Sequence, residues 1–365
     1  MKLIKYLIIF AIINSCTYST NQIIKGKGDL KLRRVEYSNL DNWSKDNHKE
    51  ALLSFLNSCK RFNKMKPHQK VGNKIGHIKA KDFDDVCHIA NLIKYTNSRQ
   101  IRNFFENWFV PYKVSNRSGN SIGKFTGYFE PILEGSLTQN SIYKYPVYAK
   151  PDNYKKYSRE EIENGALKNK NLELLYVKDK VDLFFMHIQG TGRIKLDNGD
   201  VIKLSYDGKN QRKYTSIGKY MIANNVIKSE DYSYQSIKSW LRNNPHQGQE
   251  IMNLNKSYIF FKIDHQDKVI GAQMVPLTPQ RSLAIDKDLL PYGYPIWLEV
   301  KSKGNRYKNI YNKLLITQDT GSAIKGPVRG DIYFGSGKEY EKLAARMNNN
   351  GSYYIFIPAN IVPNL

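Results

Sequence analysis

The last third of the chain is a series of short apolar runs separated by turns rich in glycine and proline, and this pattern limits the folds available to it. The runs are residues 258–263, 295–300, 313–318, 331–335 and 353–361. Runs of this length are typical of β-strands. Their close spacing favours a small barrel over a doubly wound sheet with helices on both faces.

Earlier parts of the chain alternate between helical and extended patterns. Residues 45–110 have apolar side chains at helical spacing, and we expect helices there. From about residue 122 to residue 206 the pattern predicts strands, with a hairpin turn at Asn198-Gly199. Helical patterns return over residues 214–253, where Asn244 is expected to cap a helix that has a proline at its first position.

The N-terminus has the features of an export signal. Lys2 and Lys5 precede an apolar stretch over residues 7–13, which is too short to span a bilayer. Ile-Asn-Ser-Cys follows, and it resembles the end of a bacterial lipoprotein signal, so we predict lipidation at Cys16. An ordinary secretory signal with an incidental cysteine is the alternative. Both interpretations predict export.

Two cysteines remain after the leader. Cys59 and Cys87 each lie on an apolar helical face, and an exported protein can keep a disulfide between them. Two buried cysteines that never pair are the open alternative. The chain has no C-x-x-C motif and its seven histidines lack ligand spacing, so we predict neither a metal nor another cofactor.

The net charge of +24 indicates an anionic partner, namely nucleic acid, an acidic membrane surface or an acidic polymer. No run of five or six basic residues occurs, so charge spread over solvated faces stays open as the alternative. The export leader and the absence of interleaved basic and aromatic residues argue against nucleic acid.

The segment DTGSAIKGPVRGDIYFG, residues 319–335, combines two aspartates with a glycine-rich loop. A P-loop requires Lys and Ser/Thr after its second glycine, and this chain has proline and valine there. A calcium loop beginning at Asp319 requires oxygen ligands where Gly321 and Ala323 stand. Acid–base chemistry by Asp319 and Asp331 is the interpretation that remains.

Six blocks of sequence together resemble the membrane-bound lytic murein transglycosylase A family. They are TGYFEP, FFMHIQGTGRI, YTSIGKYM, NPHQGQEIMNLNKSYIFFK, AQMVPLTPQRSLAID and QDTGSAIKGPVRGDIYFG. The resemblance covers about residues 50–365. Asp286, Asp319 and Asp331 resemble the three aspartates of that family's 3D domain.

The resemblance implies a mainly β fold with helices (α+β). A double-psi β-barrel domain is built from both ends of the chain, a smaller β-barrel domain is inserted into it, and a glycan groove lies between them. We therefore expect a signal peptide over 1–16, a polar tail over 17–44, the barrel domain over 45–132 and 256–365 with the 3D region at about 275–360, and the insertion over 133–255.

The family's activity is the non-hydrolytic cleavage of the MurNAc-β-1,4-GlcNAc bond of peptidoglycan, which leaves 1,6-anhydroMurNAc ends. We expect an exotransglycosylase, with endolytic action as the open alternative. The last of the three aspartates is the acid and then the base, which corresponds to Asp331. Its apolar neighbours at 332–334 should raise its pKa, and Arg329 would lower it if its side chain approaches. Asp286 and Asp319 are expected to support it.

The matching blocks also suggest residues that contact the glycan. They are Gly127, Tyr128, Glu130, Gln189, Gly190, Gly192, Gly321, Ser322 and Lys325. For Glu130 and Gln189, hydrogen bonding within loops is an equally weighted alternative.

The predicted partners are peptidoglycan glycan strands and a membrane reached through a lipid anchor, with no nucleic acid. The resemblance implies the outer membrane of a Gram-negative bacterium, with the protein facing the periplasm. Two other functions stay open at this point. One is a non-catalytic, expansin-like peptidoglycan-binding lipoprotein, and the other is a hydrolytic muramidase in which a second aspartate activates water.

Overall fold

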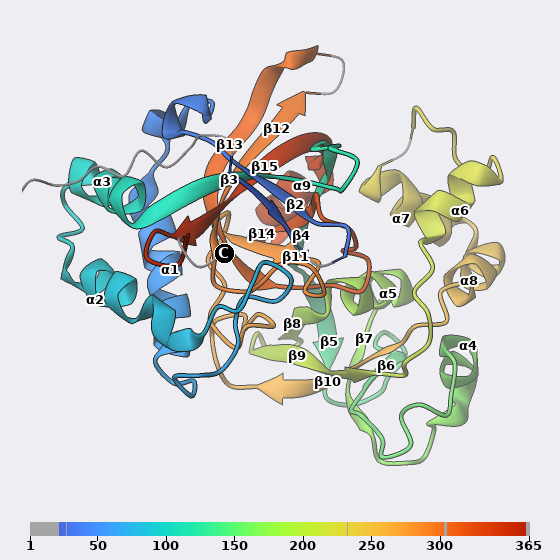
Figure 1. The fold of residues 1–365 in the computed structure, drawn as a ribbon. Helices are drawn as coiled ribbons and strands as arrows, with labels where there is room; N and C mark the ends of the chain where they lie inside the picture. The colour runs from blue at the N-terminus through green and yellow to red at the C-terminus, as the bar shows by residue number, and fades with distance from the viewer. Residues whose placement is uncertain (1–21, 27, 232, 303–304, 363–365) are drawn as a thin grey trace, which may run out of the picture.

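The computed structural model describes residues 22–362, apart from 27, 232 and 303–304, so the predicted signal peptide and Cys16 lie outside the described residues. Nine strands from both ends of the chain form one sheet (Figure 1). They are β1 (Ile23–Lys25), β2 (Lys31–Arg34), β3 (Phe109–Ser115), β4 (Gly123–Glu130), β11 (Ser282–Ile285), β12 (Pro295–Ser302), β13 (Asn305–Asp319), β14 (Arg329–Ser336) and β15 (Asn348–Pro358).

Six of these strands close into a barrel, which confirms the predicted barrel. The strand order is β1-β2-β3-β15-β12-β13-β11-β14-β4, and β15 also pairs with β4. β11 runs parallel to β13 and β14 runs parallel to β4, whereas the other pairs are antiparallel. The segment predicted as a polar tail contributes β1 and β2 beside β3, so the prediction was wrong from residue 23 onward.

Helices from both ends of the chain cover the barrel. They are α1 (His48–Phe62), α2 (Asp84–Leu92), α3 (Ser98–Trp108) and α9 (Lys338–Arg346). Because the barrel interior and these helices bury both faces of its central strands, the strands are apolar along their length; all four residues of β11 are buried, as are the first six of β12. Among the described residues, no helix is long and apolar enough to cross a membrane.

Helix α1 is attached to the end of β13 by buried polar contacts. The Ser54 hydroxyl donates to Gln318 Oε1 at 3.0 Å, and Gln318 Nε2 donates to the Ser58 hydroxyl at 3.0 Å. All three side chains are fully buried, and hydrogen bonds offset the desolvation of their polar atoms. Gln318 immediately precedes Asp319, so these contacts fix the strand end that carries this carboxylate.

A second sheet of six strands is inserted between β4 and β11. Its strands are β5 (Ile132–Ser136), β6 (Tyr145–Tyr148), β7 (Glu173–Val177), β8 (Thr191–Leu196), β9 (Val201–Lys209) and β10 (Ile259–Asp264), in the order β10-β9-β8-β5-β7-β6. The sheet curls so that its end strands, β10 and β6, approach each other. Its helices are α4 (Arg159–Glu161), α5 (Lys180–Gln189), α6 (Ile217–Ala223), α7 (Tyr234–Asn243) and α8 (Pro245–Asn253).

Two expectations for the insertion were wrong. β10 pairs with β9 along its whole length, so residues 259–264 belong to the inserted sheet and the boundary at 255 is too early. The apolar run before the hairpin forms helix α5 instead of a strand. The Asp179 carboxylate caps this helix by accepting from Val181 N at 2.7 Å and Asp182 N at 3.0 Å, and Gly190 ends it with a φ of 79°.

The turn chemistry of the insertion follows the sequence closely. β8 and β9 form the predicted hairpin, in which Lys195 pairs with Val201 around the turn, and Gly199 has a φ of 91°. α8 begins at Pro245 directly after Asn244, as the sequence predicts, but the Asn244 side chain makes no capping hydrogen bond and donates to Trp240 O at 2.9 Å. These local signals therefore determine where the elements begin and end.

The structure joins α1 to α2 by a disulfide between Cys59 and Cys87, whose Cα atoms are 5.4 Å apart. Both cysteines are buried in the core cluster that the helices share with the barrel. The bridge closes a segment of 28 residues. It therefore restricts the unfolded chain much more than a bridge between near neighbours would.

We predict that replacing Cys59 and Cys87 together by alanine lowers the free energy of unfolding by roughly 3–4 kcal/mol, because the unfolded chain regains the entropy of the closed loop. Urea denaturation of the oxidised wild type and of the double variant measures this difference. Thiol alkylation of the unfolded, unreduced wild type is the control and should label neither cysteine. An unchanged denaturation midpoint would contradict the prediction.

Candidate active site

Strand register brings two of the three aspartates into one row across the barrel. Ala284 of β11 pairs with Asp319 of β13 on one side and with Asp331 of β14 on the other. Asp331 pairs in turn with Thr126 of β4. Because neighbouring strands lie about 4.8 Å apart, the Cα atoms of the two aspartates are roughly 10 Å apart. The small side chain of Ala284 between them leaves room for their carboxylates.

Asp331 is a partly buried carboxyl group with one engaged oxygen. Its Oδ1 accepts a hydrogen bond from the Thr126 hydroxyl at 2.7 Å. Within the described chain, the other oxygen, Oδ2, has no hydrogen-bond partner in the protein. Oδ2 is also not fully buried, so this oxygen is accessible. The pKa of Asp331 is raised to about 6, because burial, together with the charge of Asp319, raises it more than Arg329 and Thr126 lower it.

The Thr126 hydroxyl is oriented by Arg329, whose Nη2 donates to it at 2.8 Å. Because the hydroxyl oxygen accepts from Arg329, its own hydrogen is available to Asp331. The sequence indicated the opposing effects of Arg329 and of the apolar neighbours on Asp331. It did not indicate Thr126, since only the pairing of β4 with β14, 205 positions apart, places this hydroxyl beside Asp331.

Both carboxylate oxygens of Asp319 accept hydrogen bonds. Its Oδ2 accepts from the Tyr128 hydroxyl at 2.6 Å, and its Oδ1 accepts from Ala272 N at 3.0 Å and Thr320 N at 2.9 Å. Burial raises the pKa of Asp319 and these three donors lower it, with a net upward shift. The carboxylate therefore ties together β4, the loop before β11 and the end of β13.

Asp286 lies outside this row and is buried, at 4% exposure. Its Oδ2 accepts from Gly326 N at 2.8 Å, and its Oδ1 contacts Lys325 Nζ at 3.3 Å. Lys325 also pairs with Asp288 at 2.6 Å. These contacts hold the loop between β13 and β14, which carries the predicted glycan contacts Gly321, Ser322 and Lys325; the side chains of the last two are exposed.

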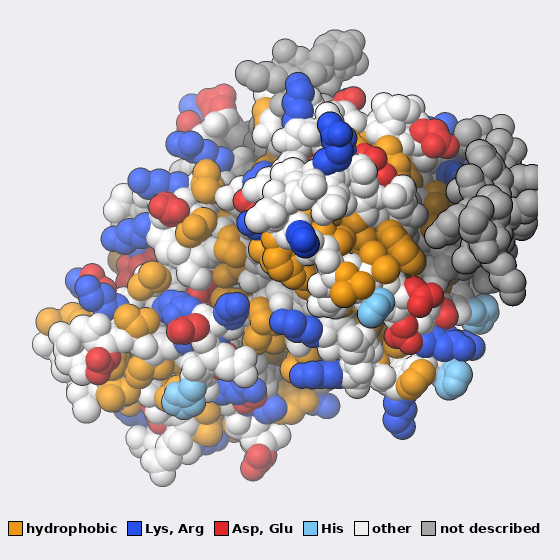
Figure 2. Space-filling view, turned by 90° about the vertical axis from the view of Figure 1, so that its left-hand side faces the viewer, with side chains coloured by type: hydrophobic (Ala, Val, Ile, Leu, Met, Phe, Trp, Pro, Cys, Tyr) orange, Lys and Arg blue, Asp and Glu red, His pale blue; other side chains and the backbone are white. Residues whose placement is uncertain are grey.

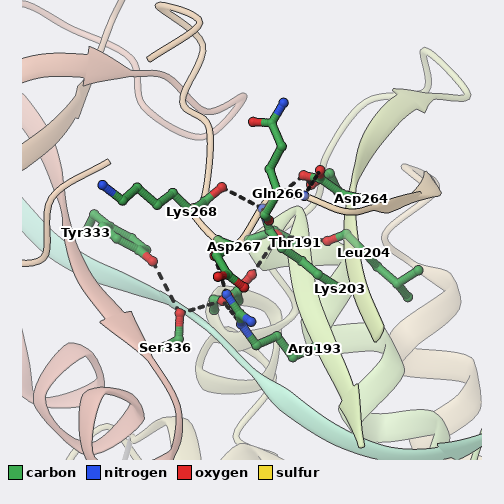
Figure 3. A network of polar contacts seen from close by, with 12 residues as sticks. Thr191, Arg193, Lys203, Leu204, Asp264, Gln266, Asp267, Lys268, Tyr333 and Ser336 are labelled. Atoms are coloured by element: carbon green, nitrogen blue, oxygen red, sulfur yellow. Dashed lines mark hydrogen bonds and ion pairs between the residues drawn. The ribbon is translucent and has the colours of Figure 1, made fainter. Parts of the chain in front are cut away.

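Glu130 does not lie where a sugar could contact it. Its carboxylate is fully buried at the junction of the two sheets, where Oε2 accepts from Arg193 Nε at 2.7 Å and from the Ser336 hydroxyl, and Oε1 accepts from the Thr191 hydroxyl at 3.3 Å. Figure 3 shows Arg193 and Thr191 of the insertion approaching Ser336 of the barrel. Of the two interpretations of Glu130, hydrogen bonding within the protein fits this geometry.

Two of the predicted glycan-contacting glycines have a role in packing. A Cβ on Gly127 would lie 2.5 Å from the Phe334 ring and 2.8 Å from Ala344 Cα, so glycine there lets α9 lie against β4. A Cβ on Gly192 would lie 2.4 Å from Met186 Sδ, so glycine there lets α5 lie against β8.

Gln189 and Tyr128 remain candidates for glycan contacts. Gln189 ends α5 and its Oε1 accepts from Phe129 N at 3.1 Å, so it reaches from the insertion to the strand that carries Tyr128. A Cβ on the neighbouring Gly190 would meet no atom within 4 Å, which means that its surroundings are open. The Tyr128 hydroxyl is hydrogen-bonded to Asp319, and the charge of Asp331 adds to burial and to Asp319 in raising its pKa.

Comparison with known proteins relates both sheets to one family. The MltA specific insert domain matches residues 124–262, and the 3D domain matches residues 281–357. The insert match includes most of β10, in agreement with the observed sheet.

Among relatives of known name, the membrane-bound lytic murein transglycosylase A of Vibrio cholerae is 37% identical over 227 residues, which are 60% of this chain and 61% of that protein. The chain thus spans less than two thirds of this relative in the alignment. The membrane-bound lytic murein transglycosylase of Agrobacterium tumefaciens superposes with a TM-score of 0.81 at 28% identity, over 91% of this chain and 99% of that one. Escherichia coli MltA with bound chitohexaose superposes with a TM-score of 0.71 at 27% identity, over 94% of this chain and 97% of that one. The chain belongs to the membrane-bound lytic murein transglycosylase A family.

Proposed function

We propose that this protein is a peptidoglycan lytic transglycosylase that acts as an exolytic enzyme on glycan strands. It would cleave the MurNAc-β-1,4-GlcNAc bond without water and leave a 1,6-anhydroMurNAc end. The observation that carries the proposal is Asp331, whose pKa is raised to about 6 while one of its carboxyl oxygens is accessible. The relatives support the substrate class, because they are named for murein and one of them holds a chitohexaose.

The reaction requires one carboxyl group to act twice. Protonated Asp331 donates its proton to the glycosidic oxygen as the bond from C1 of MurNAc to this oxygen breaks, and GlcNAc leaves with a free hydroxyl. The C6 hydroxyl of the same MurNAc then forms a bond to C1 and transfers its proton to the Asp331 carboxylate. This restores the acid, consumes no water and closes the anhydro ring. Attack within one sugar is effectively unimolecular, which favours it over attack by water.

The other aspartates position the site in this proposal. Asp319 donates nothing in its ionised form, and three hydrogen bonds occupy its oxygens, so it is poorly placed to activate a water. It fixes the Tyr128 hydroxyl, and it lies close enough to raise the pKa of Asp331. Asp286 holds the loop with Ser322 and Lys325, which we assign to glycan or stem-peptide contacts, together with Gln189.

We expect Asp331→Asn to lower the release of anhydro-muropeptides from purified sacculi by about ten-thousandfold, because the amide can neither donate nor accept the proton in either step. Mass spectrometry of the products is the measurement. A pull-down with sacculi should show unchanged binding. Asp286→Asn is the matched control, and its smaller loss should accompany a lower melting temperature.

The folding of Asp331→Asn can be checked by the pH dependence of its stability. Since burial raises the pKa of Asp331 above its value in the unfolded chain, ionisation destabilises the native state as pH rises through about 6. The asparagine variant lacks this effect and should melt at or above the wild-type temperature at pH 8 (about two pH units above this pKa).

A folded variant that keeps most of its activity would overturn the role of Asp331. Products that contain an added water would identify a hydrolase, and release of no product by the wild type would identify a binding protein.

Thr126→Val should shift the high-pH limb of the activity profile upward by about one unit. The hydroxyl stabilises ionised Asp331, so its loss raises the pKa of Asp331 beyond about 6 and keeps the acid protonated to higher pH. The profile of kcat/KM against pH measures the shift, and Thr126→Ser should restore the wild-type limb. Lower activity at every pH without a shifted limb would show that Thr126 only supports the fold.

We further infer that the protein is lipid-anchored at Cys16 in the outer membrane and faces the periplasm. The sequence of the leader and the membrane-bound relatives in Gram-negative bacteria support this location. Cys16→Ala should leave an unprocessed precursor or release the protein from the membrane fraction, because no acceptor for the lipid remains. Cell fractionation with immunoblotting tests this. A variant that still fractionates as a mature membrane protein would refute lipidation.

A further inference from the structure

A groove lined by apolar side chains runs between α2 and α3, on the outer side of the barrel domain. It encloses about 430 Å³, and its apolar lining consists of Ile89, Leu92, Ile93, Phe104 and Trp108. Leu92 is 65% exposed, although most leucines of the barrel domain are buried. Figure 2 shows hydrophobic side chains gathered into a patch on this face. A contiguous apolar surface of this kind is typical of an interaction site.

One basic side chain, Lys94, lines the groove itself. Arg99 and Arg102, on the first turns of α3, line a separate hollow with Asp46 and His48, and Arg102 pairs with Glu106 at 3.4 Å. Figure 2 shows further lysine and arginine side chains on the same face, with an acidic group and histidines at one edge. Trp108 adds a ring that has both an apolar body and a polar N–H, the type of side chain found at the boundary between lipid and water.

The start of the described chain points toward this groove. Gln22 lies beside Tyr112, whose hydroxyl donates to Gln22 Oε1 at 2.7 Å. β1 and β3 are both antiparallel to β2, so they run in the same direction. The N-terminal end of β1 therefore lies toward the Phe109 end of β3, which directly follows Trp108 of α3.

The distance to the predicted lipid is short. Cys16 precedes Gln22 by six residues, which span at most about 20 Å. Trp108 precedes Tyr112 by four residues, which corresponds to about 13 Å along a strand. A bilayer that holds a lipid on Cys16 can therefore reach the same end of the molecule as the groove.

We propose that the groove between α2 and α3 is a membrane-docking surface that lies against a phospholipid leaflet with anionic headgroups. The tether, Lys94 and the further lysine and arginine side chains on this face (Figure 2) favour this occupant over a second copy of the chain or an uncharged partner. This inference rests on the proposed lipidation for its geometry. α2 and α3 lie at the opposite side of the molecule from the insertion (Figure 1), so docking directs the insertion away from the membrane and toward the cell wall.

Vesicle flotation tests the proposal without the lipid. The chain from residue 17 onward retains every described element, and it should float with vesicles of phosphatidylethanolamine and phosphatidylglycerol but much less with phosphatidylcholine alone. Leu92→Glu should weaken the partition by about tenfold or more, because it places a charge where an apolar side chain would enter the leaflet. Leu137→Glu is the matched control, since Leu137 is 57% exposed on the insertion and should have no effect.

The outcomes separate this inference from the proposed enzyme. Leu92→Glu should release anhydro-muropeptides from soluble digests of sacculi at the wild-type rate, because it lies outside the row of aspartates. Equal flotation of Leu92→Glu and wild type, or no flotation of either, overturns the docking surface and leaves the enzymatic proposal intact. If size-exclusion chromatography shows a wild-type dimer that Leu92→Glu dissociates, the occupant is a second copy and the membrane proposal is wrong.

Discussion

The location of Asp331 depends on the register of β11, a strand of four residues that pairs on both edges. Ala284 of this strand pairs with Asp319 of β13 on one edge and with Asp331 of β14 on the other. A slip of one residue would turn the side chains of β11 to the opposite face and break this row. Polar contacts just before the row prevent a slip. Arg281 donates to both oxygens of Asp46, at 2.8 and 2.9 Å, and the Ser282 hydroxyl donates to Gln318 at 2.6 Å. These groups are buried, so a slipped register would leave them unsatisfied.

The row in turn places a carboxyl group where ionisation is unfavourable. Burial raises the pKa of Asp331, whereas Arg329 and Thr126 lower it, and the balance lies near 6. Without the cation the pKa would be higher, and the carboxyl would give up its proton to the glycosidic oxygen less readily. Without burial it would be ionised and could not donate the first. A pKa near the working pH allows both directions of proton transfer. The cost is that the ionised carboxylate is less stable in the native state.

The sequence predicted the parts of this structure that local patterns encode. The barrel strands, the hairpin at Asn198-Gly199 and the start of α8 after Asn244 follow from turn residues and apolar spacing. The aspartates were found by their motif. The assignment of β10 to the inserted sheet was missed, because the sequence of a strand does not indicate which other strand it pairs with. α5 was missed because a run such as VDLFFMHI is apolar enough for either a buried strand or a buried helix, and the capping Asp179 distinguishes them.

The role of Glu130 could not be predicted for a related reason. Its motif lies next to Tyr128, and both residue types suit sugar binding, but only the folded chain shows that Glu130 points into the junction of the two sheets. Arg193 pairs with it there, and a buried carboxylate without this partner would be strongly destabilising. The chain passes from the barrel into the insertion directly after Glu130.

The chain crosses back from the insertion to the barrel after β10, and we call this the return crossing. Asp264, the last residue of β10, accepts hydrogen bonds there from Lys203 at 2.9 Å and from the Ser205 hydroxyl. Although burial raises the pKa of Asp264, the bonds from Ser205, Gln266 and Lys203 lower it to about 2, so this carboxylate stays ionised over the whole range in which Asp331 titrates. The paired carboxylate at the return crossing thus does not change with the catalytic proton. The contact of Gln189 with the strand of Tyr128 is made by an uncharged amide, so it too can persist while Asp331 gains and loses its proton.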